Sequence, residues 1–261
     1  MNWSRTKSIF IVIFLILNSF LGYQLWEKQS NQLEFTQIYE SDLDEMLQLR
    51  DISIEIELSV DQPELAQLHV QYANYEEHLA DLAAMSGQHV RFEKDRLVSE
   101  LSEAYQRPEP FDPEHFEAEF MADNILYHDE YRFDRVTNQE IIYLQVYEDY
   151  PVFVAPLRFS QNEAQAIKRY QQVFFEVLSQ GTKQSVLSAY TAVRTSVENQ
   201  IIPTGSTVKD VTLGYYGQLY EVESQVLTPA WRVVVEHSGE IEEYYVNAFT
   251  GAIESGPTDE S

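Results

Sequence analysis

The sequence predicts an α+β protein with an N-terminal transmembrane helix and an extracellular part of two subdomains rich in antiparallel sheet. Three observations lead to this fold class. Residues 8–26 contain no charged side chain, many later segments alternate apolar and polar residues as strands do, and three prolines lie between residues 108 and 113. The chain of 261 residues has room for all of these parts and for a substantial core.

The uncharged stretch at residues 8–26 has the length of a membrane span. A helix rises about 1.5 Å per residue, so the stretch matches the roughly 30 Å hydrocarbon layer of a bilayer. Arg5 and Lys7 precede it, and positive charge beside a span favours the cytoplasmic side. We therefore expect a single-pass protein of the cell membrane, with residues 1–7 as a cytoplasmic tail and the C-terminal part outside. A cleaved signal peptide is the alternative, but no small-x-small cleavage site follows.

Small and polar residues interrupt the predicted span at Asn18, Ser19 and Gly22. Asn18 and Gly22 are four residues apart and therefore share one helix face. In lipid, such residues let helices approach closely and form hydrogen bonds with each other. These three positions are the predicted partner-binding residues, although a lone Asn in a span is also tolerated without any contact.

The composition narrows the classes of function. The chain has 43 acidic residues, all after Trp26, against 17 Lys and Arg, and its formal net charge is −26. Such a body repels nucleic acid and anionic lipid, so we expect no nucleic-acid partner. The aromatic content of 13% is too high for a disordered acidic chain. Because cysteine is absent, disulfides and thiolate metal sites are excluded.

Residues 27–50 are polar with scattered apolar positions and predict a juxtamembrane linker or stalk. The first extracellular subdomain is expected at residues 51–112, where period-two alternation is typical of strands with one wet face. Its expected elements are strands at 52–58, 68–72 and 89–92, a short helix at 76–85, and a helix or strand at 97–101.

The segment RPEPFDP, residues 107–113, is unsuited to a helix interior or a central strand and marks the subdomain boundary. Asp112 and Pro113 fit the cap and first turn of a helix that runs to about residue 125. The second subdomain, residues 113–256, precedes a frayed tail at 257–261. Its other expected elements are strands at 131–136, 140–147, 152–159, 208–216, 218–226, 230–236 and 241–249, a helix at 185–200, and either a helix or a long strand at 166–179.

Motifs for catalysis, cofactors and metals are absent from the sequence. It contains no H-E-x-x-H, G-x-S-x-G, P-loop, G-x-G-x-x-G or EF-hand pattern, and its six histidines are interpreted as surface residues. Acidic pairs such as Asp42 with Asp44 are expected by chance among so many carboxylates. We therefore predict a protein that is not an enzyme and has no cofactor. Five tyrosines fit either an aromatic recognition face or an alternation of core and rim: Tyr215, Tyr216, Tyr220, Tyr244 and Tyr245.

The two ends of the chain together resemble the YycI family, also called WalI. The resemblance rests on the N-terminal MNWSRTKSIFIVIFLILNSFLGYQLW and the C-terminal LGYYGQ, LTPAWRVVV and EYYVNAFTGAIE, while residues 31–149 support it by pattern and length. It implies a membrane-anchored accessory protein of the YycG/YycF, or WalK/WalR, two-component system. It also implies a relation to the sister protein YycH and a PepSY-like order of helix then strands near the C-terminus.

The resemblance further implies the function and the partners. A non-enzymatic regulator of this kind binds a sensor histidine kinase of the YycG/WalK type through its transmembrane helix and extracellular domains, and adjusts signalling that controls cell-wall metabolism. A YycH-like accessory protein is the second expected partner. The alternatives are a wall-facing anchored inhibitor, a module that binds a peptide or polymer at an exposed sheet edge, and, less favoured, an anchored hydrolase.

Overall fold

The computed structural model describes residues 14, 17, 18, 43–85, 87–93, 95–220 and 224–254. The chain divides into two compact units, Met1–Ser53 and Ile54–Ser261. The predicted cytoplasmic tail at 1–7, most of the predicted span at 8–26, much of the stalk at 27–50, and the C-terminal tail at 257–261 lie outside the described residues.

In the first unit, Phe14, Leu17 and Asn18 are helical and exposed, and residues 43–49 form a helix. That helix ends where Ile52 N donates to Leu47 O at 2.9 Å and Asp51 adopts a left-handed φ of 52°. No helix within the described part of the chain is long and apolar enough to cross a membrane.

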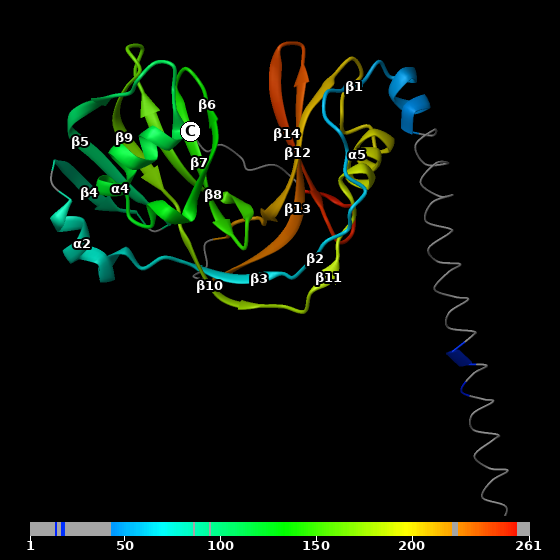
Figure 1. Cartoon of the computed structure of the whole chain (residues 1–261), viewed down its shortest axis with the longest axis horizontal. Coiled ribbons are helices and arrows are strands. Elements are labelled where there is room, and N and C mark those ends of the chain that lie inside the picture. Colours follow the sequence, from blue (N-terminus) through cyan, green and yellow to red (C-terminus); the bar gives the residue numbers. More distant parts are fainter. Residues whose placement is uncertain are drawn as a thin grey trace, which may run out of the picture. The chain divides into compact units, whose positions relative to one another are not determined.

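Strands dominate the rest of the chain (Figure 1). They are β1 (Ser53–Ile54), β2 (Glu64–Leu65), β3 (Leu68–Tyr72), β4 (Gln88–Phe92), β5 (Leu97–Gln106), β6 (Tyr131–Val136), β7 (Glu140–Tyr147), β8 (Tyr150–Gln161), β9 (Ala166–Gln172), β10 (Phe175–Gln180), β11 (Gln184–Ser185), β12 (Thr207–Tyr216), β13 (Ser224–His237), β14 (Glu240–Asn247) and β15 (Ile253–Glu254). The helical segments are η1 (Tyr75–His78), α2 (Leu79–Ala84), α3 (Pro113–Phe116), η2 (Glu117–Met121), α4 (Ala122–Asn124), η3 (His128–Glu130) and α5 (Ala189–Glu198).

Among the described residues, thirteen strands join one sheet, whose main path is β10-β3-β13-β12-β8-β9-β5-β4. The pairings among β3–β10 and β12–β15 are antiparallel except for a short parallel contact of β12 with β8, at Tyr215 and Val152. This confirms the expected α+β class with a dominant antiparallel sheet. Strands from both predicted subdomains share the sheet, since β5 pairs with β9 and β3 pairs with β10 and β13. A division of the exterior part at residue 113 stays a prediction.

Two hydrophobic cores lie on opposite faces of β7. Ile141 and Tyr143 belong to the first core, whereas Ile142 and Leu144 belong to the second. Successive side chains of a strand point to opposite faces, so β7 must be apolar on both. The first core also contains Phe116, Phe120, Phe159, Ile167 and Tyr170, and the second contains Val152, Phe153, Phe175, Tyr215, Tyr216, Leu227 and Tyr245.

Several predicted elements are confirmed. The Asp112 side chain caps the helical segment by accepting from His115 N at 3.3 Å, with Pro113 in the first turn. Residues 97–101 belong to a strand, β5. Residues 166–179, expected as a helix or a long strand, contain two strands, β9 and β10, separated at residues 173–174, so the helix alternative is wrong. The turn before them is closed by Asn162 Oδ1, which accepts from Ala166 N at 2.9 Å. The helix-then-strands order near the C-terminus is present as α5 followed by β12, β13 and β14.

Two predicted elements have the wrong bounds. The strand expected at 52–58 is reduced to β1, although its side chains still alternate in burial, because alternation selects a face but does not supply a neighbouring backbone. The helix expected at 185–200 begins at Ala189, because Ser188 caps it by accepting from Thr191 N at 3.2 Å. Residues 184–185 instead form β11, which pairs with β2.

The separate strands expected at 218–226 and 230–236 are also wrong. Residues 217–220 lie in an irregular segment, and β13 runs without a break through Pro229. Proline is tolerated there because β13 changes partner at this point. It pairs with β3 up to Leu227 and with β14 from Ala230, while the Pro229 carbonyl accepts from Ala248 N at 2.8 Å.

Candidate functional site

Of the three predicted partner-binding residues, only Asn18 is described. It lies in a helical position, its side chain is exposed, and its Nδ2 donates to the Phe14 carbonyl at 2.9 Å. Ser19 and Gly22 lie outside the described residues. The predicted helix contact through these positions stays a prediction.

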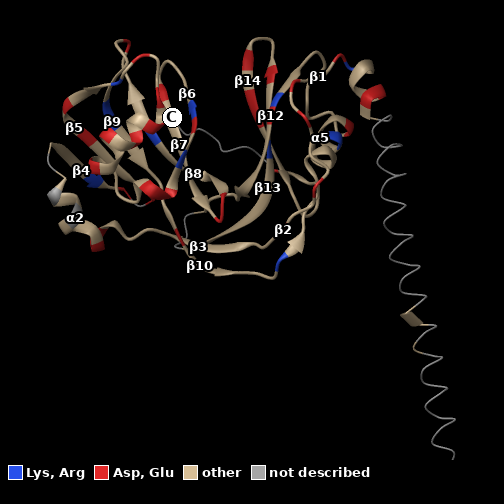
Figure 2. Cartoon of the chain, viewed as in Figure 1, with Lys and Arg blue, Asp and Glu red and all other residues tan. Residues whose placement is uncertain are grey.

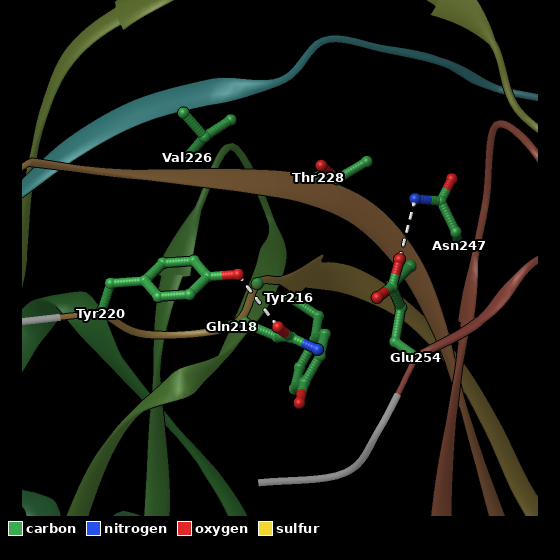
Figure 3. Close-up of a pocket in the computed structure, with 9 residues that line it drawn as sticks. Tyr216, Gln218, Tyr220, Val226, Thr228, Asn247 and Glu254 are labelled. Atoms are coloured by element: carbon green, nitrogen blue, oxygen red, sulfur yellow. Dashed lines mark hydrogen bonds between the residues drawn. The ribbon is translucent and has the colours of Figure 1, made fainter.

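A pocket opens where the chain leaves β12, and we call it the tyrosine pocket (Figure 3). Its volume is about 300 Å³, and it is lined by Tyr216, Gly217, Gln218, Tyr220, Val226, Thr228, Ala230, Asn247 and Glu254. Figure 3 shows Tyr220 and the Asn247–Glu254 pair at opposite ends of this pocket. The pocket therefore combines an aromatic ring with amide, hydroxyl and carboxylate groups.

Tyr220 is held in place although its side chain is 62% exposed. The buried side chain of Gln225 clamps its backbone, accepting from Tyr220 N at 3.2 Å and donating to Tyr220 O at 2.7 Å. The Tyr220 hydroxyl donates to Gln218 Oε1 at 3.0 Å. An exposed ring that is fixed at both ends loses little conformational freedom when it contacts a ligand.

The floor of the pocket depends on Gly217 and Tyr216. A Cβ atom on Gly217 would lie 2.6 Å from the Val226 carbonyl oxygen, so only glycine permits this approach of the two backbones. Tyr216 is buried and stacks on Tyr245 with ring centroids 4.2 Å apart. The pocket is thus built directly on the second core.

A network of ion pairs connects β6 to β13 and β14. Arg232 donates to Asp134 at 2.7 Å, and both side chains are less than a tenth exposed. Arg135 bridges Asp134 at 2.6 Å and Glu243 at 2.7 Å, and the Tyr245 hydroxyl donates to Glu243 at 2.8 Å.

Arg232 is further enclosed by the ring of Phe153, whose centroid is 5.0 Å from its guanidinium carbon. Burial by itself lowers the pKa of Arg232, but the hydrogen bond and charge of Asp134, with the charge of Glu243, raise the pKa overall. The guanidinium therefore stays charged, and the network ties the first core's β6 to the second core's strands.

The five tyrosines predicted as either a recognition face or core residues divide between the two. Tyr215, Tyr216 and Tyr245 are buried in the second core, so the recognition-face alternative is wrong for them. Tyr244 is half-buried with its hydroxyl on Glu242, and Tyr220 is exposed. Within this group, Tyr220 alone presents an open ring at the tyrosine pocket.

Alkaline pH is expected to destabilise the protein through its buried tyrosines. Burial raises the pKa of Tyr170 and Tyr215 to about 12, from an ordinary value of 10.0. As pH rises, the unfolded chain therefore loses these protons before the folded protein does. The contribution of the two tyrosines to the free energy of unfolding is fully present below about pH 10 and is lost between about pH 10 and 12. Each group should contribute roughly 2–3 kcal/mol to that decline.

Urea unfolding at about pH 8 and about pH 11.5 measures this loss, and the ultraviolet absorbance of tyrosinate shows whether ionisation accompanies unfolding. An unchanged free energy of unfolding across this range would contradict the prediction.

A second concavity has an acidic lining. Its volume is about 430 Å³, and it is lined by Glu117, Asp129, Glu130, Tyr131, Arg132, Val146 and Asp149. Burial raises the pKa of Glu117 and of Glu130, while Arg132 pairs with Asp149 at 3.3 Å. Among the described residues, no group of three or more His, Asp or Glu side chains is placed to hold a metal ion.

Figure 2 shows acidic residues spread over many elements, including β14 and β5.

Three of the described histidines have local polar partners. His78 Nε2 lies 2.7 Å from the Tyr127 hydroxyl, His115 pairs with Glu119 at 2.9 Å, and His237 Nδ1 lies 3.0 Å from Ser206 Oγ. These contacts account for the three side chains without any catalytic arrangement.

Comparison with known proteins places the chain in a family. The model of the family described as YycI protein matches residues 30–249, which is most of the sequence. The chain belongs to the YycI family. This confirms the resemblance in the C-terminal motifs, and membership in the YycI family, a family of regulatory accessory proteins, indicates a role in regulating the YycG/WalK system. No curated protein matches the chain significantly.

One solved structure that resembles this YycI-family chain is the crystal structure of an uncharacterized protein from Eubacterium rectale ATCC 33656. Its sequence is 13% identical, the alignment covers 78% of this chain and 90% of that chain, and the TM-score is 0.47.

The sequence did not reveal most of the residues that build these sites. Asp134 and Arg232 are separated by 98 positions, and nothing local predicts that they meet. The one available signal is that Arg232 is a lone charge inside the apolar run AWRVVV, because a buried charge requires a partner. For the tyrosine pocket, the available sequence signal is the pair of glycines in LGYYGQ, close to Tyr215, Tyr216 and Tyr220.

Proposed function

We propose that this chain is a non-enzymatic accessory regulator that binds a membrane sensor histidine kinase of the YycG/WalK type and adjusts signalling that controls cell-wall metabolism. The observation that supports this is the YycI family match over residues 30–249. In this proposal a single span at residues 8–26 anchors the chain in the cell membrane, the N-terminus is cytoplasmic, and the sheet-rich part is extracellular. A YycH-like accessory protein is the second proposed partner.

The proposal assigns the kinase contact first to the span. Asn18 and Gly22 share one helix face, which lets a neighbouring helix approach closely. The extracellular part then acts as a modulator of how the kinase helices pack. Charge supports this division of roles, because the strongly acidic part of a chain with a net charge of −26 favours basic partner surfaces over the membrane surface itself.

Replacement of residues 8–26 by an unrelated spanning helix is expected to abolish co-purification of the cognate kinase with the full-length chain. The reason is that the replacement keeps the membrane anchor but removes the contact face. The measurement is the amount of kinase recovered per amount of tagged chain from detergent-solubilised membranes. Undiminished recovery would show that the helix is only an anchor.

A finer version uses Asn18→Leu combined with Gly22→Leu. Kinase recovery is expected to fall roughly three- to thirtyfold, because contacts of this kind contribute about 0.6–2 kcal/mol. The matched control is Ile16→Leu combined with Phe20→Leu, the same spacing on the opposite helix face. Equal losses in the two double variants would overturn the assignment of the contact face.

The tyrosine pocket favours one further candidate function, a binding module for an extracellular ligand. It adds a ligand site to the regulator and does not replace it. The observation behind it is that Tyr220 is both exposed and clamped, as described above.

A further inference from the structure

We propose that the tyrosine pocket binds one unit of a neutral saccharide, a sugar ring that carries hydroxyl and acetamido substituents. This inference goes beyond the proposed function, which concerns the kinase, and it stands or falls independently of it. It rests on the shape of the pocket, on the chemistry of its lining and on the charge around it.

The size of the pocket fits a single small ring. Its volume of about 300 Å³ lies at the lower end of the range of small-molecule sites, roughly 300–1,000 Å³. The pocket is open to solvent, and two of its lining residues, Tyr220 and Val226, are exposed. A polymer can therefore place one unit in the pocket while the neighbouring units remain outside.

The lining matches the two kinds of surface that a sugar presents. The C–H face of a sugar ring is apolar and packs against an aromatic ring, which the clamped Tyr220 supplies. Hydroxyl and acetamido groups need donors and acceptors, which Gln218, Asn247 and Glu254 supply. Asn247 Nδ2 already donates to Glu254 Oε1 at 3.3 Å, so the amide and the carboxylate are oriented together.

The charge of the lining argues against an anionic ligand. Glu254 is the charged residue among the nine that line the pocket, and neither Lys nor Arg is among them. The body around it is strongly acidic. A phosphate-bearing polymer would therefore be repelled, whereas a neutral sugar would not.

The lining also argues against a protein anchor as the occupant. A pocket for an apolar partner side chain is desolvated and mainly apolar at its centre. Here Gln218, Thr228, Asn247 and Glu254 bring polar groups into a space whose apolar surface comes from Val226, Ala230 and the two tyrosines. An apolar side chain in the pocket would cover these polar groups without forming hydrogen bonds to them, and that loss would lower the affinity.

The test is a titration of the purified full-length chain with the tetramer of N-acetylglucosamine, followed by calorimetry and by saturation-transfer NMR. We expect saturable binding with a Kd on the order of 1 mM, as suits a shallow site for one ring. Tyr220→Ala should weaken binding about tenfold because the stacking surface is lost. Tyr220→Phe keeps the ring and should retain binding within about threefold.

The matched control is Leu178→Ala on β10, another exposed apolar side chain at 54% exposure, which should bind like the unaltered chain. Thermal unfolding of each variant checks that it is folded. Absence of saturable sugar binding, or equal weakening by Tyr220→Ala and Leu178→Ala, would overturn the proposal. Saturable binding of a lysine-rich peptide or a glycerol phosphate oligomer in place of the sugar would overturn it too. None of these outcomes affects kinase co-purification, so the two proposals fail separately.

Discussion

Gly214→Ala is expected to destabilise the protein by at least about 3 kcal/mol, the upper end of typical overpacking costs. Gly214 lies on β12 where this strand approaches β8. A Cβ atom there would lie 2.3 Å from the Pro151 carbonyl oxygen and 2.7 Å from Phe153 Cε2. The first obstacle is backbone, which has no rotamer to change, so the two strands must separate. Urea unfolding of the purified variant and of the unaltered chain measures the difference in the free energy of unfolding.

Gly181→Ala is the matched control for this effect. Its added Cβ would meet Gln67 O at 3.6 Å, an ordinary van der Waals distance. The free energy of unfolding should change by less than about 1 kcal/mol, with a small gain because alanine restricts the unfolded chain. Similar losses in both variants would show that glycine-to-alanine changes in general, and not the β12–β8 approach, limit stability.

Asp134→Asn is expected to cost about 3–5 kcal/mol, because it leaves the buried guanidinium of Arg232 without its main counter-charge. Asp134 and Arg232 side chains are 7% and 9% exposed. Asp210 lies 3.9 Å from the same guanidinium and offsets only part of the loss. Since the pair ties β6 to β13, hydrogen exchange should also rise in β6. Both effects are measured on one preparation, by urea unfolding and by exchange mass spectrometry.

The control for the buried pair is Asp149→Asn, which removes the carboxylate from an exposed Arg–Asp pair. Asp149 and Arg132 are 94% and 58% exposed, so this change should cost less than about 1 kcal/mol. The double variant Asp134→Asn with Arg232→Met should recover much of the loss, because no uncompensated charge stays buried. A double variant as unstable as the sum of its single changes would refute the charge explanation.

Much of the fold was predictable because its signals are local. Strands β6, β7 and β8 follow from the β-branched and aromatic residues at their own positions, and the Asp112–Pro113 start of α3 follows from two adjacent residues. The break expected at residues 227–229 was wrong, because whether Pro229 interrupts a strand depends on which neighbouring strand would need its missing N–H. The shortened β1 has the same kind of cause, since a strand extends only as far as a neighbouring backbone pairs with it.

The candidate sites were less predictable than the fold. Tyr220 stood among five tyrosines with equal claims in the sequence, and only its clamp by Gln225 and Gln218 distinguishes it from the buried Tyr216 and Tyr245. Asn18 and Gly22, by contrast, were chosen from spacing alone, and their role is still a prediction.

By itself, the sequence determined the α+β class, the uncharged stretch at residues 8–26, the acidic character of the body and membership in the YycI family. These properties are set by composition and by spacing over a few residues, which a linear pattern records directly. Only the tertiary structure decided that β7 separates two cores, that Asp134 meets Arg232, and that Tyr220 faces a pocket. Each of these depends on backbones far apart in the chain, and long-range pairing leaves no local periodicity by which to recognise it.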